Sequence, residues 1–522
     1  MENSMKNLPI GIQSFEDLRS KDYLYVDKTE IIHRLITSGK VFLLSRPRRF
    51  GKSLLVSTLE AIFRGQKELF EGLWIEDKID WTQLNHPVIR IDFGGINNKT
   101  AEDLKKDFEN VILQIANNYG IMLTRNGAGS FAELIAKMHI TTGQQVVVLI
   151  DEYDKAILDN MTNDEVMEGN KQVLHDFYQV LKATDEHLRF VFLTGVSKFA
   201  GLSIFSGLNN LNDITLDKNY VSICGYTQKE LDHYFAEYLT KLAESIGMSN
   251  SESIDGIRRW YNGYSWDGET PVYNPFSTLL LFDKKEFGNY WFSTGTPTFL
   301  IKLLMQRDQL DPILESVIAE ARDFNSFNPQ EISEIPLLFQ TGYLTIKKKE
   351  IVNLRPRYTL EMPNLEVRES LLECLLSAYS RYPVGGILIQ RMQEQLLDND
   401  AGGLEKSLRE MLAHIPYQLH IGKEAYYHSL LLLWLKLLGF DVAGEVSTNK
   451  GRIDTVWKIN GHTVIAEVKF QVQEENISDL LDKAIAQIKK KHYAERFDDG
   501  HKVSLLAVVF AGKEIGCRIE KM

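Results

Sequence analysis

The chain has 522 residues and a net charge of −12 at pH 7, with 44% hydrophobic and 25% charged residues. Such a composition fits a globular protein of about three domains. It excludes a protein that coats nucleic acid through its overall charge, because such binding needs many phosphate contacts, but it leaves room for a local basic groove.

The cysteines and the apolar runs predict where the protein works. Cys224, Cys374 and Cys517 are an odd number and widely separated, and the first residues contain no apolar signal core. We therefore expect a protein of the reducing cytoplasm. The longest apolar run, Leu430 to Leu438, contains Lys436 and is too short to cross a bilayer, so no membrane segment is expected.

The first informative stretch follows an apolar strand predicted at Val41 to Leu44. Residues 45–53 read Ser-Arg-Pro-Arg-Arg-Phe-Gly-Lys-Ser, and an apolar helix follows them. A strand, a tight turn that ends in Gly-Lys-Ser and a helix are the layout of a phosphate-binding loop. Gly51 lets the backbone approach a phosphate, Lys52 would reach the terminal phosphates of ATP, and the Ser53 hydroxyl would ligate magnesium.

Three arginines crowd this turn. Arg46 stands where the usual pattern has its first glycine, five residues before Gly51. Arg46 and Arg49 are expected to add positive charge around the phosphates. The alternative is a loop that binds differently from an ordinary phosphate loop.

Alternating strands and helices after this loop favour a parallel α/β sheet. We predict a strand at Pro87 to Phe93, a helix over about 100–119 and a fully buried strand at Val146 to Ile150. Asp151 and Glu152 follow that strand directly, at the edge where an open α/β sheet places its ligand chemistry. Asp151 would hold magnesium through water and Glu152 would orient and deprotonate an attacking water, unless both only cap a helix.

A further strand is predicted at Arg189 to Leu193, and Thr194 follows it. In nucleotide hydrolases of this layout, the strand beside the acidic one carries a polar residue that senses the terminal phosphate. Thr194 or Ser197 would fill this role. The alternative is that either hydroxyl only forms a turn.

These stretches together resemble the AAA-ATPase-like family of the Bacteroides type. The resemblance covers Leu8 to about Asp217 and implies a P-loop ATPase domain, with Arg46 as a regular feature of the family's loop. The stretches that carry it are Ile10 to Phe15, Tyr25 to Thr29, Ser45 to Ser53, Ile150 to Asp154 and Leu193 to Lys198.

Residues 218–400 read as a mostly helical lid and a winged-helix-like connector. Thr227, with Glu230 three residues later, predicts a capped helix start. Ile335 to Ile346 predicts a helix followed by a hairpin strand. The aromatic run Trp260 to Trp266 has the composition to stack bases, but a domain core is the favoured interpretation.

Two further features of this region have plain interpretations. Arg258 and Arg259 could act as arginine fingers, but a solvated helix end is favoured. Asp398 to Gly403 is polar and contains two glycines, so we expect a flexible linker there.

A second group of elements follows this linker. We predict a helix at Glu424 to Leu438, a strand at Asp441 to Val446, a hairpin with strands at 451–457 and 462–469, a helix at Leu480 to Lys491 and a strand at Val503 to Phe510.

Three charged residues of this hairpin can converge. Side chains alternate along a strand, so Glu467 and Lys469 face one side, and the paired strand can offer Asp454 opposite them. Two carboxylates can hold magnesium or manganese while the lysine activates water for phosphodiester hydrolysis. The alternative is a surface ion pair between Asp454 and Lys469.

The order helix, hairpin, helix, strand resembles the PD-(D/E)xK nuclease superfamily, and specifically its family often fused behind the AAA-ATPase-like domain. The resemblance spans about Glu405 to the end of the chain. It implies a restriction-endonuclease-like α/β fold with Asp454, Glu467 and Lys469 as the catalytic core. It also implies Glu424 as an auxiliary acid, and Gln487 and Tyr493 as supporting positions.

The leading hypothesis is a cytoplasmic protein with domains at 1–217, 218–400 and 405–522 that couples an ATP-dependent switch or motor to a metal-dependent nuclease. Lys489 to Lys491 with Arg496 add a local basic patch for nucleic acid. The resemblance suggests an action on DNA in defence or mobile-element biology. The alternatives are a non-cleaving ATP-dependent regulator or scaffold and an ATPase that works on proteins. Assembly into a homo-oligomer stays open.

Overall fold

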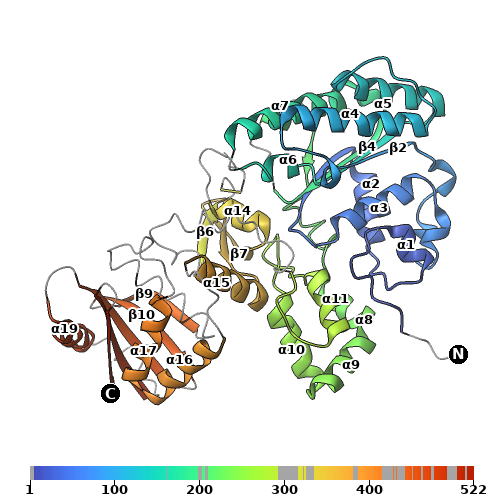
Figure 1. Ribbon diagram of the computed structural model, residues 1–522. Coiled ribbons are helices and arrows are strands. Elements are labelled where there is room, and N and C mark those ends of the chain that lie inside the picture. The colour runs from blue at the N-terminus through green and yellow to red at the C-terminus, as the bar shows by residue number, and fades with distance from the viewer. Residues whose placement is uncertain are drawn as a thin grey trace. The chain divides into compact units, whose positions relative to one another are not determined.

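The computed structural model describes most of the chain, and Figure 1 draws the rest as a thin grey trace. The chain divides into two compact units, one made of residues 1–296 and 318–367 and the other of 297–317 and 368–522. The described residues are 5–161, 163–197, 203–205, 208, 210–291, 316–320, 323–324, 334–379, 386–413, 427, 431, 435, 441–448, 451–459, 462–471, 475–490, 502–511 and 514–521.

A parallel sheet forms the centre of the first unit and confirms the predicted α/β class. Its five strands, within the described residues, have the order β2-β3-β4-β1-β5, and each neighbouring pair is parallel. The central strands are apolar and buried on both faces, as a sheet between two helix layers requires. The strands are β1 (Val41–Ser45), β2 (Val88–Asp92), β3 (Val146–Asp151), β4 (Leu188–Gly195) and β5 (Asn212–Asp213).

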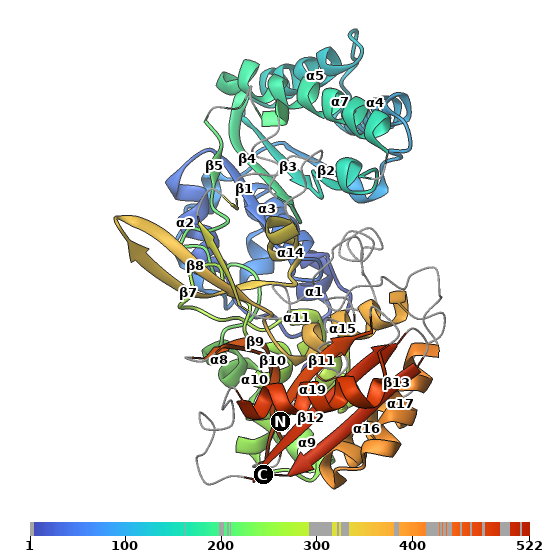
Figure 2. The same ribbon diagram turned by 90° about the vertical axis from the view of Figure 1, so that its left-hand side faces the viewer.

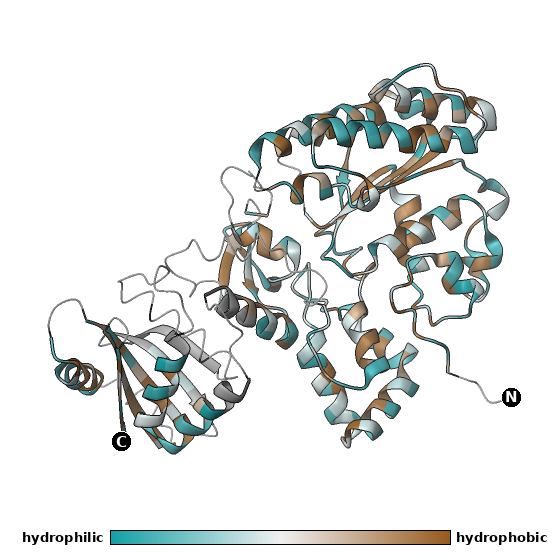
Figure 3. Ribbon diagram, in the orientation of Figure 1, coloured by the Kyte–Doolittle hydropathy of each residue, from teal (hydrophilic) through white to brown (hydrophobic). Residues whose placement is uncertain are grey.

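Helices cover both faces of this sheet. One layer holds α4, α5 and α7, which pack against one another, and the other holds α1, α2 and α3 (Figures 1 and 2). In Figure 3 the strands between the layers are mostly brown, the colour of hydrophobic residues. The helices are α1 (Phe15–Ser20), α2 (Thr29–Ser38), α3 (Lys52–Phe63), α4 (Ala101–Asn118), α5 (Ala128–Thr142), α6 (Lys155–Leu158) and α7 (Asp164–Ala183).

The strand order decides which residues meet. β1 lies beside β4, which lies beside β3, and the register pairs Leu44 with Thr194 and Asp92 with Asp151. Parallel strands end at the same edge of a sheet, so the turn after β1 and the acids after β3 share that edge. The candidate site of the first unit is built there.

A helical lid follows the sheet. Thr227 and Glu230 form the predicted capping box at its first helix. Its core is rich in aromatic side chains, and Tyr261 and Tyr273 are fully buried in it, which confirms packing rather than base stacking. The lid helices are α8 (Gln228–Tyr234), α9 (Ala236–Ile246), α10 (Asn250–Tyr261) and α11 (Pro275–Lys284).

The predicted helix and hairpin strand of the connector are confirmed. α14 ends in a tight turn at Gly342, whose φ of +91° favours glycine, and the hairpin β7–β8 follows. Within the described residues β6 completes a sheet of order β6-β8-β7. The elements are β6 (Val317–Glu320), α14 (Glu334–Thr341), β7 (Thr345–Val352), β8 (Arg355–Glu361) and α15 (Leu365–Tyr379).

The second unit contains a mixed sheet of order β13-β12-β11-β10-β9 among the described residues. The pair β11–β12 is parallel and the other pairs are antiparallel, and α19 packs on the sheet through Leu481, Ile485 and Ile488. The predicted hairpin, helix and strand are confirmed, whereas β13 was not predicted. The elements are α16 (Gly386–Asp398), α17 (Ala401–Ala413), β9 (Asp441–Thr448), β10 (Gly451–Ile459), β11 (His462–Phe470), α19 (Ile477–Lys490), β12 (Lys502–Ala511) and β13 (Glu514–Lys521).

The flexible linker expected at Asp398 to Gly403 is wrong. α16 ends at Asp398 and α17 starts at Ala401, so only two residues join them. The Gly403 amide donates to the Asp400 side chain at 2.9 Å, which makes Asp400 a helix cap. The polar residues therefore stabilise a helix start. Across the described part of the chain, no helix is long and apolar enough to cross a membrane.

Candidate functional site

The turn after β1 delivers the start of α3 to the sheet edge. Gly51 is the residue before the helix, and its φ of +88° lies in the left-handed region that glycine enters without strain. Lys52 and Ser53 are the first residues of α3, and Ser53 lies near Asp151 at the end of β3. Free amides at a helix start carry positive charge and attract anions.

Lys52 is the buried cation of this turn. Its Nζ donates to the carbonyl oxygens of Arg46 and Pro47, both at 3.0 Å, and the side chain is only 7% exposed. Burial lowers the pKa of Lys52, while the acids Asp151 and Asp154 oppose that shift. The loop therefore holds an ammonium group by neutral carbonyls, which an incoming phosphate can replace.

The expectation that Arg46 contacts phosphate is not supported by its contacts. Its guanidinium is fully buried and donates to the carbonyls of Ser45, Thr215 and Tyr220 at 2.8–3.1 Å. Its carbon Cζ lies 3.9 Å from the ring centre of Trp266. Arg46 thus ties the loop to the following chain segment, and this role explains a long side chain where the ordinary pattern has glycine.

Aromatic side chains of the lid frame the rest of the loop. Trp291 donates its indole N–H to the Arg48 carbonyl at 3.0 Å, and Phe50 lies edge-on to Tyr264 at 4.8 Å between ring centres. Arg49 is exposed, has a φ of +67°, and its Cζ lies 4.8 Å from the Phe276 ring. Of the predicted pair, Arg49 is the arginine that stays accessible to a ligand.

Asp151 ends β3 opposite this turn. Burial raises the pKa of Asp151, whereas the nearby Ser53 hydroxyl and Lys52 lower it. Its Oδ1 accepts the Glu152 amide at 3.0 Å, and its buried Oδ2 makes no hydrogen bond with the described residues. The structure thus brings together the predicted Lys52, Ser53 and Asp151.

Glu152 occupies a strained position beside them. Its φ of +53° is uncommon for a residue with a side chain. A Cβ atom on Gly94 would lie 3.1 Å from Glu152 Oε2 and 2.8 Å from Asp92 Oδ1, so the glycine leaves room for two carboxylates. The end of β2 therefore shapes the space around the predicted base.

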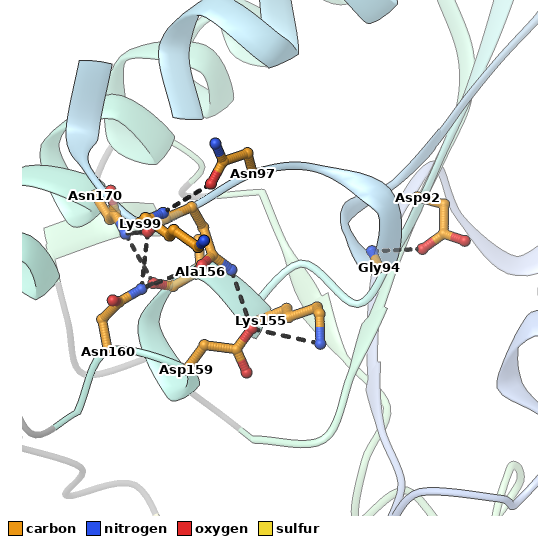
Figure 4. Close-up of polar contacts among 10 residues, drawn as sticks. Asp92, Gly94, Asn97, Lys99, Lys155, Ala156, Asp159, Asn160 and Asn170 are labelled. Atoms are coloured by element: carbon orange, nitrogen blue, oxygen red, sulfur yellow. Dashed lines mark hydrogen bonds and ion pairs between the residues drawn. The ribbon is translucent and has the colours of Figure 1, made fainter. Parts of the chain in front are cut away.

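A network of amides fixes the segment that follows Gly94 (Figure 4). The Asn98 carbonyl accepts from the side chains of Asn160 and Asn170, both at 2.9 Å. Both amides also reach the Ala156 carbonyl on α6, at 2.9–3.0 Å. The Asn98 side chain donates to Asp159, which also pairs with Lys155 at 3.4 Å. The loop after β2 is thereby fastened to the helices that follow Glu152.

The end of β4 is joined to the acidic segment by Asp154. Its Oδ2 accepts the amides of Val196 and Ser197 at 2.9 and 2.5 Å, and burial raises the pKa of Asp154 to about 6. Thr194 donates its hydroxyl to the Leu44 carbonyl at 2.9 Å, so the contact found for Thr194 is structural. The Ser197 hydroxyl is buried and makes no hydrogen bond within the described residues.

A cavity of about 450 Å³ adjoins this edge. Lys52, Ser53 and Glu152 belong to its polar lining, together with further charged residues, and apolar residues from the start of the chain and from the lid complete the lining. The further charged residues are Lys28, Arg48, Arg49, Asp154 and Lys155. Ligand pockets usually have such a volume and such a mixture. The apolar lining includes Ile12, Leu24, Tyr226, Phe276 and Leu279.

The second predicted site lies on β11. Glu467 is fully buried, and Lys469 Nζ lies 2.9 Å from Glu467 Oε1 on the same face of the strand. Gln487 of α19 donates to that same oxygen. The paired strands match Thr455 with Ala466, so backbone position 454 lies one residue beyond this pair, on the side of Glu467. The predicted Glu467, Lys469 and Gln487 thus come together.

Several predictions for this site lie outside what the structure describes. Glu424, Tyr493 and Arg496 fall on undescribed residues, and the Asp454 side chain does so too. Within the described side chains, no group of three histidines, cysteines or acids could hold a metal ion. Of the predicted basic patch, Lys489 pairs with Glu520 and Lys490 is exposed.

Two contributors to the first site were not predicted. Asp92 ends an apolar strand in the way that Asp151 does, and the same rule could have found it. Trp291 contacts Arg48 across 243 residues of sequence, and no local pattern signals such a contact.

Comparison with known proteins identifies the families of two segments of the chain. Residues 9–205 match the family model described as predicted AAA-ATPase, and residues 422–520 match that of the PD-(D/E)XK nuclease superfamily. The chain belongs to the predicted AAA-ATPase family and carries a C-terminal PD-(D/E)XK nuclease superfamily domain. Both resemblances expected from the sequence are thereby confirmed at the family level.

One relative of this chain is similar to it over nearly its whole length. It is an uncharacterized protein in the vnfD 5′ region of Azotobacter chroococcum mcd 1, 43% identical over 520 residues, with 97% of each chain covered. Among solved structures, the ORC2 protein of Aeropyrum pernix has a TM-score of 0.25 and 11% identity, covering 67% of this chain and 92% of that one. This likeness is too low to support any argument.

Proposed function

We propose that the first unit binds and hydrolyses ATP. The observation that carries this proposal is the meeting of Lys52 and Ser53, at a helix start, with Asp151 and Glu152 at the end of β3, beside a cavity of about 450 Å³. Lys52 is the group to bind the terminal phosphates, because its present acceptors are neutral carbonyls. Glu152 is the group to take a proton from water.

The residues present fit a magnesium ion. Ser53 and Asp151 are near neighbours, and Asp151 keeps a buried oxygen without a hydrogen bond among the described residues. A bound ion would neutralise charge on phosphate oxygens. Ser53 would hold it directly and Asp151 through water. The lining of Ile12, Tyr226 and Phe276 would receive the base, since flat apolar surfaces suit a purine.

The second unit is proposed to cleave phosphodiester bonds in nucleic acid. Glu467 and Asp454 would hold magnesium or manganese, and Lys469 would position the attacking water. Support comes from Lys469 and Gln487 converging on one oxygen of a buried Glu467. A setting in defence or mobile-element biology and assembly into a homo-oligomer stay predictions from the resemblance.

Nucleotide titration tests the first activity. Lys52→Ala is expected to weaken ATP binding at least about 100-fold, because the phosphate charge loses its partner. Lys67→Ala, an exposed lysine outside the cavity, is the matched control. Glu152→Gln is expected to bind ATP normally and to hydrolyse it at least about 100-fold more slowly. Equal affinity of wild type and Lys52→Ala would refute the assignment.

Cleavage of single- and double-stranded DNA and RNA, with and without metal and ATP, tests the second activity. Glu467→Gln and Asp454→Asn are expected to weaken metal binding, measured by calorimetry, and to abolish cutting. Lys469→Ala should retain the metal but cut poorly. If wild type neither binds metal nor cuts any of these substrates, the nuclease assignment fails and a non-cleaving ATP-dependent regulator replaces it.

A further inference from the structure

The outer part of the β7–β8 hairpin concentrates positive charge in an acidic protein. Residues 347–357 contain five basic side chains, Lys347, Lys348, Lys349, Arg355 and Arg357, and all five are exposed. Glu350 is the one acidic residue of this stretch, whereas the whole chain has a net charge of −12. We call residues 347–357 the basic hairpin.

The ion pairs of the basic hairpin leave most of its charge available. Glu350 contacts Lys348 at 2.7 Å and Arg357 at 3.4 Å, and these two contacts lower the pKa of Glu350. Lys347, Lys349 and Arg355 form no ion pair with any described residue, and Lys349 Nζ lies 5.8 Å from the ring centre of Tyr358. Three cations on two adjacent strands therefore face solvent.

The end of the hairpin is apolar and strained. Leu354 is 95% exposed and Ile351 is 65% exposed. Asn353 and Leu354 form the turn with φ values of +50° and +64°, which match the twist of a two-residue hairpin loop but disfavour a leucine. Folding alone gives no reason for a bare leucine there, because it buries no surface. A partner that covers this end would supply the reason.

The base of the hairpin is rigid. Ser265 and Thr345 hydrogen-bond each other through backbone and hydroxyl groups at 2.6 and 3.1 Å. Gly268 packs so closely that an added Cβ would lie 3.1 Å from both Ile346 and the Lys349 amide. Tyr358 and the rest of the base are buried, whereas Figure 2 shows the gold strands β7 and β8 extending away from the other elements of the first unit.

We propose that the basic hairpin binds double-stranded nucleic acid, with Lys347, Lys349 and Arg355 on the phosphates and the apolar end in a groove. A two-stranded ribbon has the width that the major groove of DNA admits. Charge complementarity favours a polyanion as the partner. The choice of nucleic acid rests on the proposed nuclease function of the second unit, because a nuclease domain acts on such a substrate. The hairpin would hold the duplex without reading its sequence, since phosphate contacts carry no sequence information.

Salt-dependent binding of the full-length protein to a fluorescent DNA duplex, measured by anisotropy without divalent metal, tests this proposal. Each phosphate contact contributes about 0.9 to the slope of log affinity against log salt concentration. The triple variant Lys347→Glu, Lys349→Glu, Arg355→Glu is expected to lose about 3 from that slope and at least about tenfold in affinity at physiological salt. Leu354→Ser should weaken binding by less and leave the slope unchanged.

The control variant changes the same charges elsewhere. Lys105→Glu and Lys106→Glu on α4 with Lys182→Glu on α7 alter three exposed lysines of the helix layer. This variant is expected to bind DNA nearly as wild type does. Circular dichroism and ATP affinity of both triple variants report folding, because neither set of changes touches the cavity.

Three outcomes would overturn the proposal. The first is equal loss in both triple variants, which would indicate a non-specific charge effect. The second is DNA binding with an unchanged slope in the hairpin variant. The third is charge-dependent binding to vesicles of anionic lipid with no binding to the duplex, which would assign the hairpin to membranes. Glu467→Gln should bind the duplex without cutting it, so failure of the nuclease and failure of the hairpin are distinguishable.

Discussion

The two candidate sites hold their lysines in opposite ways. Lys52 is buried and donates to two neutral carbonyls of its own loop, at 3.0 Å. Lys469 is partly exposed and contacts a full negative charge, the buried Glu467, at 2.9 Å. Neutral dipoles solvate a cation without cancelling its charge, so Lys52 keeps its attraction for an anion. The charge of Lys469 is already matched, and it stabilises a carboxylate that a metal would share.

Another buried charged group of the first unit, Glu366, resembles Lys52 in having neutral partners. Glu366 is fully buried, and its partners are also neutral: the Ser277 hydroxyl at 2.8 and 2.9 Å and the Trp291 amide at 2.7 Å. Lys52 and Glu366 of the first unit are therefore held by neutral dipoles, whereas Glu467 of the second unit is held by an opposite charge. Lys28 of the first unit is held in that second way, because it pairs with Glu230 at 2.6 Å. Removing single groups should affect the two units differently.

The largest expected effect is a difference between Lys469→Ala and Lys52→Ala in the free energy of unfolding, measured without ligands. Lys469→Ala leaves Glu467 buried without its cation and is expected to lower the free energy of unfolding of the second unit by about 3–5 kcal/mol. Lys52→Ala breaks no contact ion pair: it frees two carbonyls, removes a longer-range attraction to Asp151 and Asp154, and relieves a desolvated charge. These terms oppose one another, so a change within about 1 kcal/mol is expected. Urea unfolding followed for each unit measures both, and equal losses would contradict the comparison.

The next effect concerns the pH dependence of stability. Burial raises the pKa of Glu366 from 4.5 to about 7, so the folded state binds more protons than the unfolded state between these values. The contribution of Glu366 is complete below pH 4.5 and is lost as the pH rises through 7. Glu366→Gln removes this loss and should gain at most about 3 kcal/mol over wild type at pH 8.

Thermal unfolding of wild type and Glu366→Gln between pH 4.5 and 8 checks this sign. The groups that face Glu366 are Ser277 of α11, the amides of Tyr290 and Trp291 and the Tyr264 side chain. Burial raises the pKa of Tyr264 well above its ordinary value, so this side chain keeps its proton over the tested range and adds no slope. The serine and the amides are neutral partners. A stability difference that is constant with pH would refute the raised pKa of Glu366.

A smaller effect tests the assignment of Arg46 to structure. Lysine cannot reach three carbonyls and stack on Trp266 at once, so Arg46→Lys should lower the free energy of unfolding by about 2 kcal/mol. The exposed Arg49→Lys is the control and should change stability by less than about 0.5 kcal/mol. If Arg46→Lys weakens ATP binding without any loss of stability, the phosphate contact expected from the sequence is restored.

The smallest effect is kinetic. Gly94→Ala places a methyl group against Asp92 and Glu152, and it is expected to slow ATP hydrolysis about tenfold with little change in ATP affinity. Gly95→Ala is a matched control, because a Cβ there meets nothing within 4 Å. Equal rates for the two variants would show that Gly94 does not shape the space around Glu152.

Contiguous patterns predicted most of the fold and the centre of each site. Apolar runs located β1, which leads into the Gly-Lys-Ser turn, and β3, which ends in Asp151. The alternation along β11 placed Glu467 and Lys469 on one face. Such signals are local because a strand and its turn are adjacent in sequence. β13 was missed because its residues are mostly half-exposed and carry no clear alternation.

The contacts that the sequence did not predict join residues that are far apart along the chain. The charge of Arg46 suggested a phosphate ligand, but its acceptors lie around Thr215 and Tyr220, which the sequence does not place nearby. The contact between Trp291 and the Arg48 carbonyl is equally non-local. Side chains whose partners come from other elements are assigned only once the tertiary structure is known.

The segment Tyr264 to Gly268 contacts both the phosphate loop and the base of the basic hairpin. Trp266 lies on Arg46 of the phosphate loop, while Ser265 and Gly268 support the base of the basic hairpin. A short rigid connection of this kind makes thermodynamic linkage between ATP and nucleic acid an expected property. Linkage is reciprocal: if ATP changes the affinity of the hairpin for a duplex by some factor, the duplex must change the affinity for ATP by the same factor. The affinity for either ligand would then report whether the other is bound.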